Sequence, residues 1–208
     1  MEFLVTMTTR VPDGTAQESV DEVRAREAAR SAELAAQGHL TRLWRPPLAP
    51  GEWRTLGLFS AAGAAELEKV LASMPLRVWR SDAVVPLTSH PNDPAPGGPS
   101  FAAPGGAAGG AEFFTYFMSA IPADAPAALV AERRAGERAR VFELHGQGHF
   151  LRLWRLPPED GRALGLWRAH DLAEVVTLLR TLPLDPWLRV ETVPLTRHPN
   201  DPAPDPAS

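Results

Sequence analysis

Two glutamates stand where a helix should present apolar side chains to a core. Residues 16–38 are rich in Ala, Glu, Arg and Leu, and Glu27 lies in the middle of their apolar stripe. The corresponding stripe in residues 125–148 carries Glu137. A carboxylate between a helix and a sheet loses solvation, which raises its pKa toward neutrality and suits it to proton abstraction. The spacing therefore indicates two candidate general bases.

Helical periodicity also allows a purely structural interpretation of Glu27. A glutamate at the margin of the stripe can extend its carboxylate to solvent, or pair with Arg24 or Arg30 of the same helix. Its repetition as Glu137 does not decide between the two interpretations, because duplicated copies inherit neutral residues as well as functional ones. Both interpretations stay open on periodicity alone.

The two helices belong to a tandem duplication. The segment GHLTRLWR at 38–45 returns as GHFLRLWR at 148–155, and PLTSHPNDPAP at 86–96 returns as PLTRHPNDPAP at 194–204. The displacement is 110 residues for the first pair and 108 for the second, so a net two residues are missing from the second copy. The chain therefore carries one unit twice.

Composition places the boundaries of the copies. Residues 96–111 are dominated by Pro, Gly and Ala, which offer little apolar surface to offset ordering entropy, and they indicate a flexible linker. We expect the first repeat over residues 1–95 and the second over 112–208. A linker of this length lets one copy pack on the other as an intramolecular pseudo-dimer at high effective concentration.

Each copy shows the order strand, helix, strand, strand, helix, strand. In the first copy we expect strands at 2–12, 39–45, 53–60 and 77–87, and helices at 16–38 and 64–74. This is the ferredoxin-like order, in which the helices cover one face of a four-stranded sheet. The other face is apolar, and the second copy can cover it. We predict an α+β fold of two ferredoxin-like (βαββαβ) repeats packed sheet-to-sheet as an intramolecular dimeric α+β barrel.

Composition also excludes several classes of function. With 21 basic and 25 acidic residues, the chain has no bulk positive field to attract nucleic acid or an anionic membrane. The absence of cysteine excludes thiolate metal sites and disulfides and fits a cytoplasmic protein. No segment approaches the roughly 20 apolar residues that cross a bilayer. The six histidines show no metal-ligand spacing. We expect a cytoplasmic protein that binds a small molecule, without nucleic acid, membrane or metal.

Four further side chains are candidates for substrate binding. Arg45 and Arg155 each end a strand beside a turn, where a guanidinium could hold a substrate carboxylate bidentately. The alternative is an ion pair with a helix carboxylate. His90 and His198 precede proline in the repeated tail, where they serve either the structure of the tail or contact with substrate.

The order and spacing of these residues resemble the muconolactone Δ-isomerase family nearly end to end. The first copy carries the resemblance in MEFLVTMTTRVP at 1–12, Glu27, Gly38, LWR at 43–45, MPL at 74–76 and SHP at 89–91. The second copy carries it in Glu137, LWR at 153–155, LPL at 182–184 and RHP at 197–199. The resemblance covers residues 1–95 and 112–203, everything except the linker.

The resemblance implies a ferredoxin-like fold, dimers that assemble into rings, and an active site built from two subunits. A higher homo-oligomer of the pseudo-dimer would follow from it. It also implies the family's reaction, the conversion of muconolactone to the enol-lactone of 3-oxoadipate, with no metal or organic cofactor. The family's single base is a helix glutamate that aligns with Glu27, and hence with Glu137. That base would remove the proton γ to the lactone carbonyl and return it to the α carbon.

The chain departs from the family around the lactone. The family places a tyrosine and, two residues later, an asparagine in the strand after LWR. The best matches are Trp53 and Thr55 in the first copy, which we expect to contact substrate, and Gly161 and Ala163 in the second. The family's histidine just before LWR is Arg42 here.

These observations predict a cofactor-independent isomerase that moves a proton on an unsaturated, muconolactone-like lactone or a related enolisable small molecule. Glu27 and Glu137 are the predicted acid/base residues. One alternative is a biosynthetic cyclase or isomerase acting on a larger substrate. The other is a non-catalytic module that binds a small ligand or serves in assembly.

Overall fold

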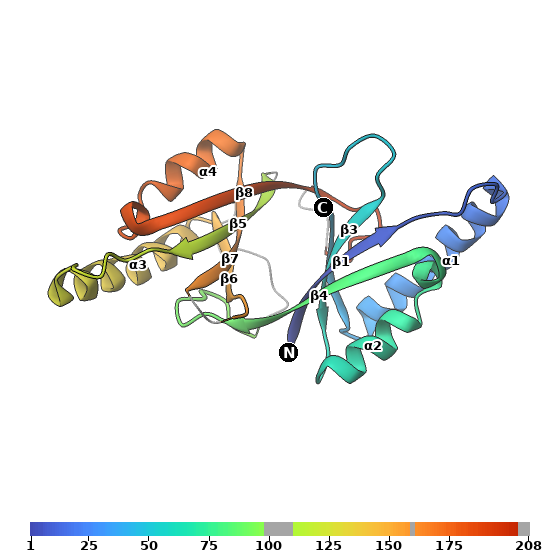
Figure 1. Ribbon diagram of the computed structural model, residues 1–208, viewed down its shortest axis with the longest axis horizontal. Helices are drawn as coiled ribbons and strands as arrows, with labels where there is room; N and C mark the ends of the chain where they lie inside the picture. Colours follow the sequence, from blue (N-terminus) through green and yellow to red (C-terminus); the bar gives the residue numbers. More distant parts are fainter. Residues whose placement is uncertain (98–109, 159–160, 204–208) are drawn as a thin grey trace. The chain divides into compact units, whose positions relative to one another are not determined.

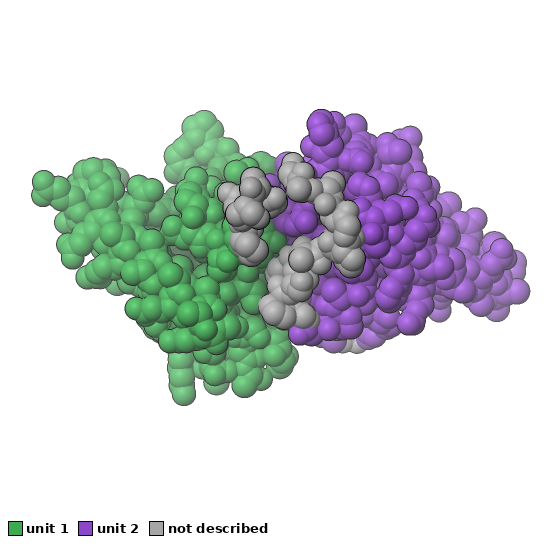
Figure 2. Space-filling view, turned by 180° about the vertical axis from the view of Figure 1, so that it is seen from behind, with its two compact units in different colours: residues 1–87, 196–205 green, residues 88–195, 206–208 purple. Residues whose placement is uncertain are grey.

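The computed structural model describes residues 1–97, 110–158 and 161–203. The chain forms two units, residues 1–87 with 196–205 and residues 88–195 with 206–208 (Figure 2). Most of the predicted linker, residues 98–109, lies outside the described residues. The units differ from the two sequence copies in one respect. The tail of the first copy, from residue 88, belongs to the second unit, and the tail of the second copy, from residue 196, belongs to the first.

The first unit is a four-stranded antiparallel sheet with two α-helices (Figure 1). Its elements are β1 Glu2–Thr9, α1 Gln17–Ala36, β2 Leu40–Arg45, β3 Arg54–Ser60, α2 Ala64–Ala72, the 3-10 helix η1 Pro75–Trp79, and β4 Arg80–Ser89. Strand β1 pairs with β3 and β4, and β2 pairs with β3, so the order across the sheet is β4-β1-β3-β2. The core of this unit lies between the sheet and the helices, where Phe3, Val5 and Met7 of β1 meet Leu34 of α1 and Leu71 of α2.

The second unit repeats this plan. Its elements are β5 Ala111–Ser119, α3 Ala127–Gly146, β6 Phe150–Arg155, β7 Arg162–Ala169, α4 Leu172–Leu179, the 3-10 helix η2 Asp185–Trp187, and β8 Leu188–Arg197. The strand order is β8-β5-β7-β6. Within the described ranges, none of the helices has both the length and the apolar character that spanning a membrane requires.

A glycine turn fixes the path from the first helix to the second strand in each unit. Gly38 has φ +78° and Gly148 has φ +86°, the left-handed conformation that glycine adopts without steric cost. The N–H groups of Gly38 and His39 donate to the last carbonyls of α1 at 3.0 and 2.8 Å, which is the Schellman pattern of helix termination. Both glycines therefore cap the helices before them, and each turn sets where the next strand begins relative to the helix glutamate.

The long last strand of each copy runs from one unit into the other. The final two residues of β4 pair with β6, and the final two residues of β8 pair with β2. Hydrogen bonds therefore join the strands in the closed order β1-β3-β2-β8-β5-β7-β6-β4. The α+β class, the two βαββαβ repeats and the barrel-type ring of strands are confirmed.

The start of each last strand differs from the sequence expectation. In the first copy the sequence predicts strand from residue 77, whereas η1 occupies this position and β4 begins at Arg80. In the second copy η2 likewise precedes β8, which begins at Leu188. Proline in the first turn of each 3-10 helix fixes φ near the helical value and supplies no N–H, so a tight turn forms before the strand. This turn presents backbone N–H groups toward the helix glutamates.

A buried aspartate anchors each exchanged tail. Asp201 accepts a hydrogen bond from the Leu43 N–H at 2.8 Å and pairs with Arg42 at 3.2 Å, and its side chain is 0% exposed. Asp93 pairs with Arg152 at 3.2 Å in the same way, and both side chains are 0% exposed. Arg42 therefore serves to hold the tail.

We predict that Asp201→Ala lowers the free energy of unfolding by about 3–5 kcal/mol, because it leaves Arg42 buried without its carboxylate. Urea denaturation followed by circular dichroism measures this. The matched control is Glu22→Ala, which removes a pair with Arg26 at 3.8 Å between side chains 72% and 60% exposed. The control should change the free energy of unfolding by less than about 0.5 kcal/mol. A loss for Asp201→Ala as small as that of the control would contradict this role.

Candidate functional site

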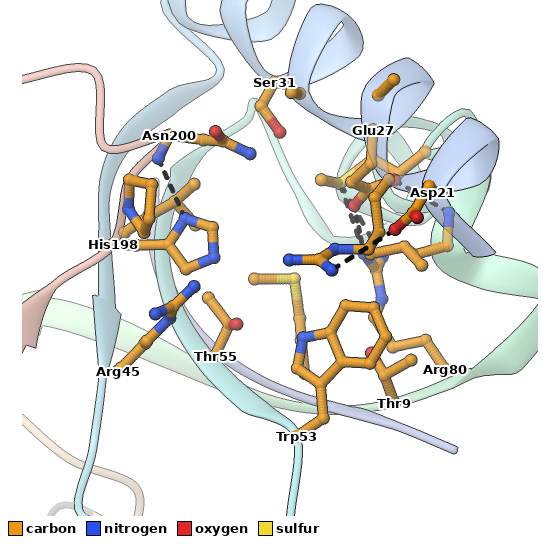
Figure 3. Close-up of a pocket in the computed structure, with 18 residues that line it drawn as sticks. Thr9, Asp21, Glu27, Ser31, Arg45, Trp53, Thr55, Arg80, His198 and Asn200 are labelled. Carbon is orange, nitrogen blue, oxygen red and sulfur yellow. Dashed lines mark hydrogen bonds and ion pairs between the residues drawn. The ribbon is translucent and has the colours of Figure 1, made fainter. Parts of the chain in front are cut away.

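A cavity of about 310 Å³ opens in the first unit (Figure 3). Its wall is formed by α1, the ends of β1, β2 and β3, the start of β4, and the turn between α2 and η1. Residues 198–200 complete the wall, and they come from the tail of the second copy. The cavity therefore needs both copies of the sequence, although all of its lining belongs to one unit.

Glu27 lies on the cavity side of α1 and is 7% exposed. Its Oε2 accepts a hydrogen bond from the Leu76 N–H at 2.8 Å, and its Oε1 accepts one from Arg80 at 3.0 Å. The Leu76 N–H is available because it lies in the first turn of η1, where a helix offers its N–H groups no internal acceptor. The carboxylate is thus buried and held at both oxygens.

The surroundings of Glu27 act on its ionisation in opposite directions. Burial raises the pKa of the carboxyl above its ordinary value of 4.5, and this effect outweighs the lowering by the Leu76 hydrogen bond and the Arg80 charge. The charge of Asp82 raises the pKa further. A carboxylate with a raised pKa is a stronger base at neutral pH than one in water.

The partner of Glu27 is not one that helix periodicity offered. Arg24 pairs with Asp21 at 3.7 Å and Arg30 pairs with Glu33 at 2.7 Å, so the alternative in which Glu27 pairs with either arginine is wrong. The ion pair comes instead from Arg80 at the start of β4. Sequence reasoning missed Arg80; the two copies do differ there, since the second has Leu188 at the matching position, but that difference does not say what Arg80 contacts.

Arg45 and His198 lie across the cavity from Glu27 (Figure 3). His198 Nδ1 accepts the Asn200 N–H at 3.1 Å, so in the neutral ring Nε2 carries the proton and is a donor. Burial, together with the charges of Arg45 and Arg24, lowers the pKa of His198 to about 4. Within the part of the chain that the structure describes, no carboxylate pairs with Arg45. The cavity therefore combines a cation without a carboxylate partner and a neutral hydrogen-bond donor.

Trp53 and Thr55 form the floor of the cavity in Figure 3. Thr55 is 9% exposed, and the Arg24 guanidinium lies 5.5 Å from the centre of the Trp53 ring. Five of the predicted site residues therefore line one cavity. They are Glu27, Arg45, Trp53, Thr55 and His198.

The other three predicted residues belong to the second unit. Glu137 is 8% exposed and accepts the Leu184 N–H at 2.9 Å. Burial raises its pKa, and the charge of Asp185 adds to this effect. The pKa of His90 is lowered by burial and by the charge of Arg155. The second unit thus repeats the glutamate, arginine and histidine of the first.

The surroundings of this second set are more apolar. At the positions of Ser31, Trp53, Thr55, Arg80 and Asp82, the second copy has Val141, Gly161, Ala163, Leu188 and Val190. Among residues 1–97, 110–158 and 161–203, no cluster of three or more His, Asp or Glu side chains could hold a metal ion. The polar groups that surround the glutamate of the first unit are therefore mostly absent from the second.

Comparison with known proteins identifies the family. The model of the family described as muconolactone delta-isomerase matches residues 1–93 and again 112–201. Muconolactone Delta-isomerase 1 of Acinetobacter lwoffii is 35% identical over 92 residues, which is 44% of this chain and 93% of that protein. Muconolactone Delta-isomerase of Rhodococcus opacus is 31% identical over 91 residues, 44% of this chain and 95% of that protein.

Solved structures resemble the chain over one copy or over both. Chlorite dismutase from Candidatus Nitrospira defluvii matches 96% of this chain and 92% of its own with a TM-score of 0.58 and 12% identity, which shows a shared fold alone. A muconolactone isomerase crystal structure matches 44% of this chain and 92% of its own, with 26% identity and a TM-score of 0.40. Since the family match recurs in both copies, the chain belongs to the muconolactone Δ-isomerase family, as two copies in tandem.

Proposed function

We propose that the chain is a cofactor-independent isomerase that moves a proton on muconolactone or a related unsaturated lactone acid, with Glu27 as the single acid/base of the first unit. One observation carries the proposal: a buried carboxylate with a raised pKa lines an open cavity of about 310 Å³. A scaffold protein would need neither the open cavity nor the buried charge, which costs free energy to maintain.

The cavity offers a place for each part of such a substrate. Arg45, exposed at the cavity wall and without a carboxylate partner among the described residues, would hold the substrate carboxylate. The Trp53 ring and the Thr55 hydroxyl would contact the lactone ring. Because Trp53 and Thr55 replace the family's tyrosine and asparagine, the preferred lactone can differ from muconolactone. In the second unit, Arg155 and His90 would take the corresponding roles beside Glu137.

The proton transfer uses lone pairs that the protein leaves free. An ionised carboxylate has about four acceptor sites, and the hydrogen bonds from Leu76 and Arg80 occupy two of those on Glu27. A free lone pair accepts the proton γ to the lactone carbonyl, and the electrons of the C–H bond pass through the ring to the carbonyl oxygen. The carboxyl group then returns this proton to the α carbon. The double bond moves, and no atom is gained or lost.

The developing negative charge needs a donor aimed at the carbonyl oxygen. His198 is suited to this role because its Nδ1 is already occupied by the Asn200 N–H and its Nε2 carries a proton in the neutral ring. A neutral imidazole stabilises the dienolate without giving up a full proton. In this proposal a tuned carboxylate and hydrogen-bond donors suffice, and no metal or organic cofactor takes part.

The proposal includes how the chain works in the cell. We infer that it acts in the cytoplasm as an intramolecular pseudo-dimer, in which the tail of the second copy brings His198 to the cavity of the first. A higher homo-oligomer of this pseudo-dimer is part of the same proposal, and light scattering measures it.

We predict that Glu27→Gln lowers kcat by roughly 10²- to 10⁴-fold, because glutamine keeps the size of the side chain but cannot accept the proton. Isomerisation of muconolactone and related butenolides, followed by NMR in D₂O, measures the rate and the exchange. Glu137→Gln should have the smaller effect, and the double variant should be inactive. Glu22→Gln, on the exposed side of α1, is the matched control. A folded double variant with full rate would return the protein to the binding-module alternative.

We predict that His198 titrates near pH 4 in the folded protein, because burial and the Arg45 charge lower its pKa to about 4. NMR of the ring nitrogens, assigned with His198→Gln, measures the titration and the tautomer. An unfolded histidine titrates near 6.5, so the unfolded chain takes up the proton first. Stability from this group is present above about pH 6.5 and is lost as pH falls toward 4. A midpoint near 6.5 would show that the ring is charged in the acid range and unsuited to the proposed role.

A further inference from the structure

The sharpest difference between the two units lies beside the glutamate. In the β1–β4 and β5–β8 ladders, Arg80 and Leu188 occupy the same position, opposite the last residue of the first strand. Two residues later stand Asp82 in the first unit and Val190 in the second. Leu188 and Val190 pack against the apolar core of their unit. One copy therefore has an ion pair where the other has two apolar side chains.

Contacts other than the one with Glu27 fix the orientation of the Arg80 guanidinium. Its side chain is 2% exposed, and Asp82 accepts from it at 2.7 Å through one oxygen and 3.2 Å through the other. The Leu71 carbonyl accepts a further contact at 3.5 Å. The remaining donor reaches Glu27 Oε1 at 3.0 Å. This bidentate contact with Asp82 fixes the plane of the guanidinium. The remaining NH group of Arg80 therefore points in a defined direction, toward Glu27.

Glu137 has no such support. Its carboxylate accepts the Leu184 N–H, as Glu27 accepts that of Leu76, but Leu188 stands where the arginine would be. Within the described residues no cation pairs with Glu137. The nearby charge that acts on it is Asp185, which disfavours its ionised form. The corresponding glutamates of the two units therefore have different partners.

We propose that Arg80, held by Asp82, is a positioning residue that keeps Glu27 ionised and aimed into the cavity, and that this pair makes the first unit the more active site. The inference rests on the proposed role of Glu27 as base. It adds a residue that the resemblance does not supply, because the second copy lacks it at the matching position.

The sign of the effect follows from the charges around Glu27. They are Asp21 and Arg24 of α1, Glu68 of α2, Arg77 of η1, Arg80 and Asp82 of β4, and Arg45 and His198 across the cavity. Arg77 and Glu68 act through Asp82, because Arg77 pairs with both. The Arg80 charge favours the ionised carboxylate more than the Asp82 charge disfavours it. Removing the pair together should therefore shift ionisation of Glu27 to higher pH.

The test is the double variant Arg80→Leu/Asp82→Val, which installs the residues of the second copy and removes one charge of each sign. Carboxyl ¹³C NMR, assigned with Glu27→Gln, follows the ionisation without any substrate. We expect the Glu27 midpoint to move to higher pH, and the acid limb of kcat/KM to move with it. At pH 7, kcat/KM should fall roughly 10- to 100-fold and recover in part at higher pH.

Two further variants keep the test decisive. Arg80→Gln retains donors for Asp82 and should shift the midpoint in the same direction, so it replaces the double variant if that fails to fold. Leu188→Arg/Val190→Asp is the matched exchange in the second unit and should move the Glu137 midpoint to lower pH.

The outcomes separate this inference from the proposed function. An unchanged Glu27 midpoint in a folded variant, or a rate loss equal at all pH values with a lowered Tm, would overturn the positioning role while leaving Glu27 as base. Full activity of Glu27→Gln would overturn the proposed function, whatever the titration shows. A shifted midpoint and a shifted acid limb together support the inference.

Discussion

The burial of one carboxylate, that of Glu27, is the constraint on which the first unit depends. Burying a charge costs free energy, and hydrogen bonds and an opposite charge offset that cost by replacing the lost water. The fold supplies both at the junction of η1 and β4, where a 3-10 turn frees the Leu76 N–H and the strand begins with Arg80. The expected straight entry into the last strand would supply neither. The irregular turn therefore supplies the partners that the buried carboxylate needs.

The duplication matters because the cavity is assembled across the two copies. The tail of the second copy is held by Asp201 against the strand that carries Arg42, and this places His198 across the cavity from Glu27. The tail of the first copy belongs to the second unit, where Asp93 pairs with Arg152. Because the two copies are covalently linked, each tail is present at high effective concentration near the unit that it joins. The linkage also lets the two sites differ in sequence, which identical subunits could not do, and the pair Arg80 and Leu188 is one such difference.

Part of the site could be predicted from sequence, and the reason lies in periodicity. A glutamate in an apolar helical stripe is visible at helical spacing, and Arg45 at a strand end is visible beside it. That His198 lines the cavity of the first unit could not be predicted. The two tails are nearly identical in sequence, and no local pattern indicates which unit each tail joins. Arg80 escapes for a different reason, since an arginine after a proline turn looks like a solvated residue until its neighbours are known. Local patterns report the faces of elements, whereas ion pairs between elements depend on the tertiary arrangement.

The most direct measurement of the central claim is a crystal structure of the Glu27→Gln variant with muconolactone bound. We expect the lactone in the cavity of the first unit, with its carboxylate on Arg45. The γ carbon should lie roughly 3–3.5 Å from the amide that replaces the base, the separation of reacting atoms in a near-attack geometry. The carbonyl oxygen should face His198. A lactone bound with its γ carbon away from residue 27, or bound outside this cavity, would contradict the account.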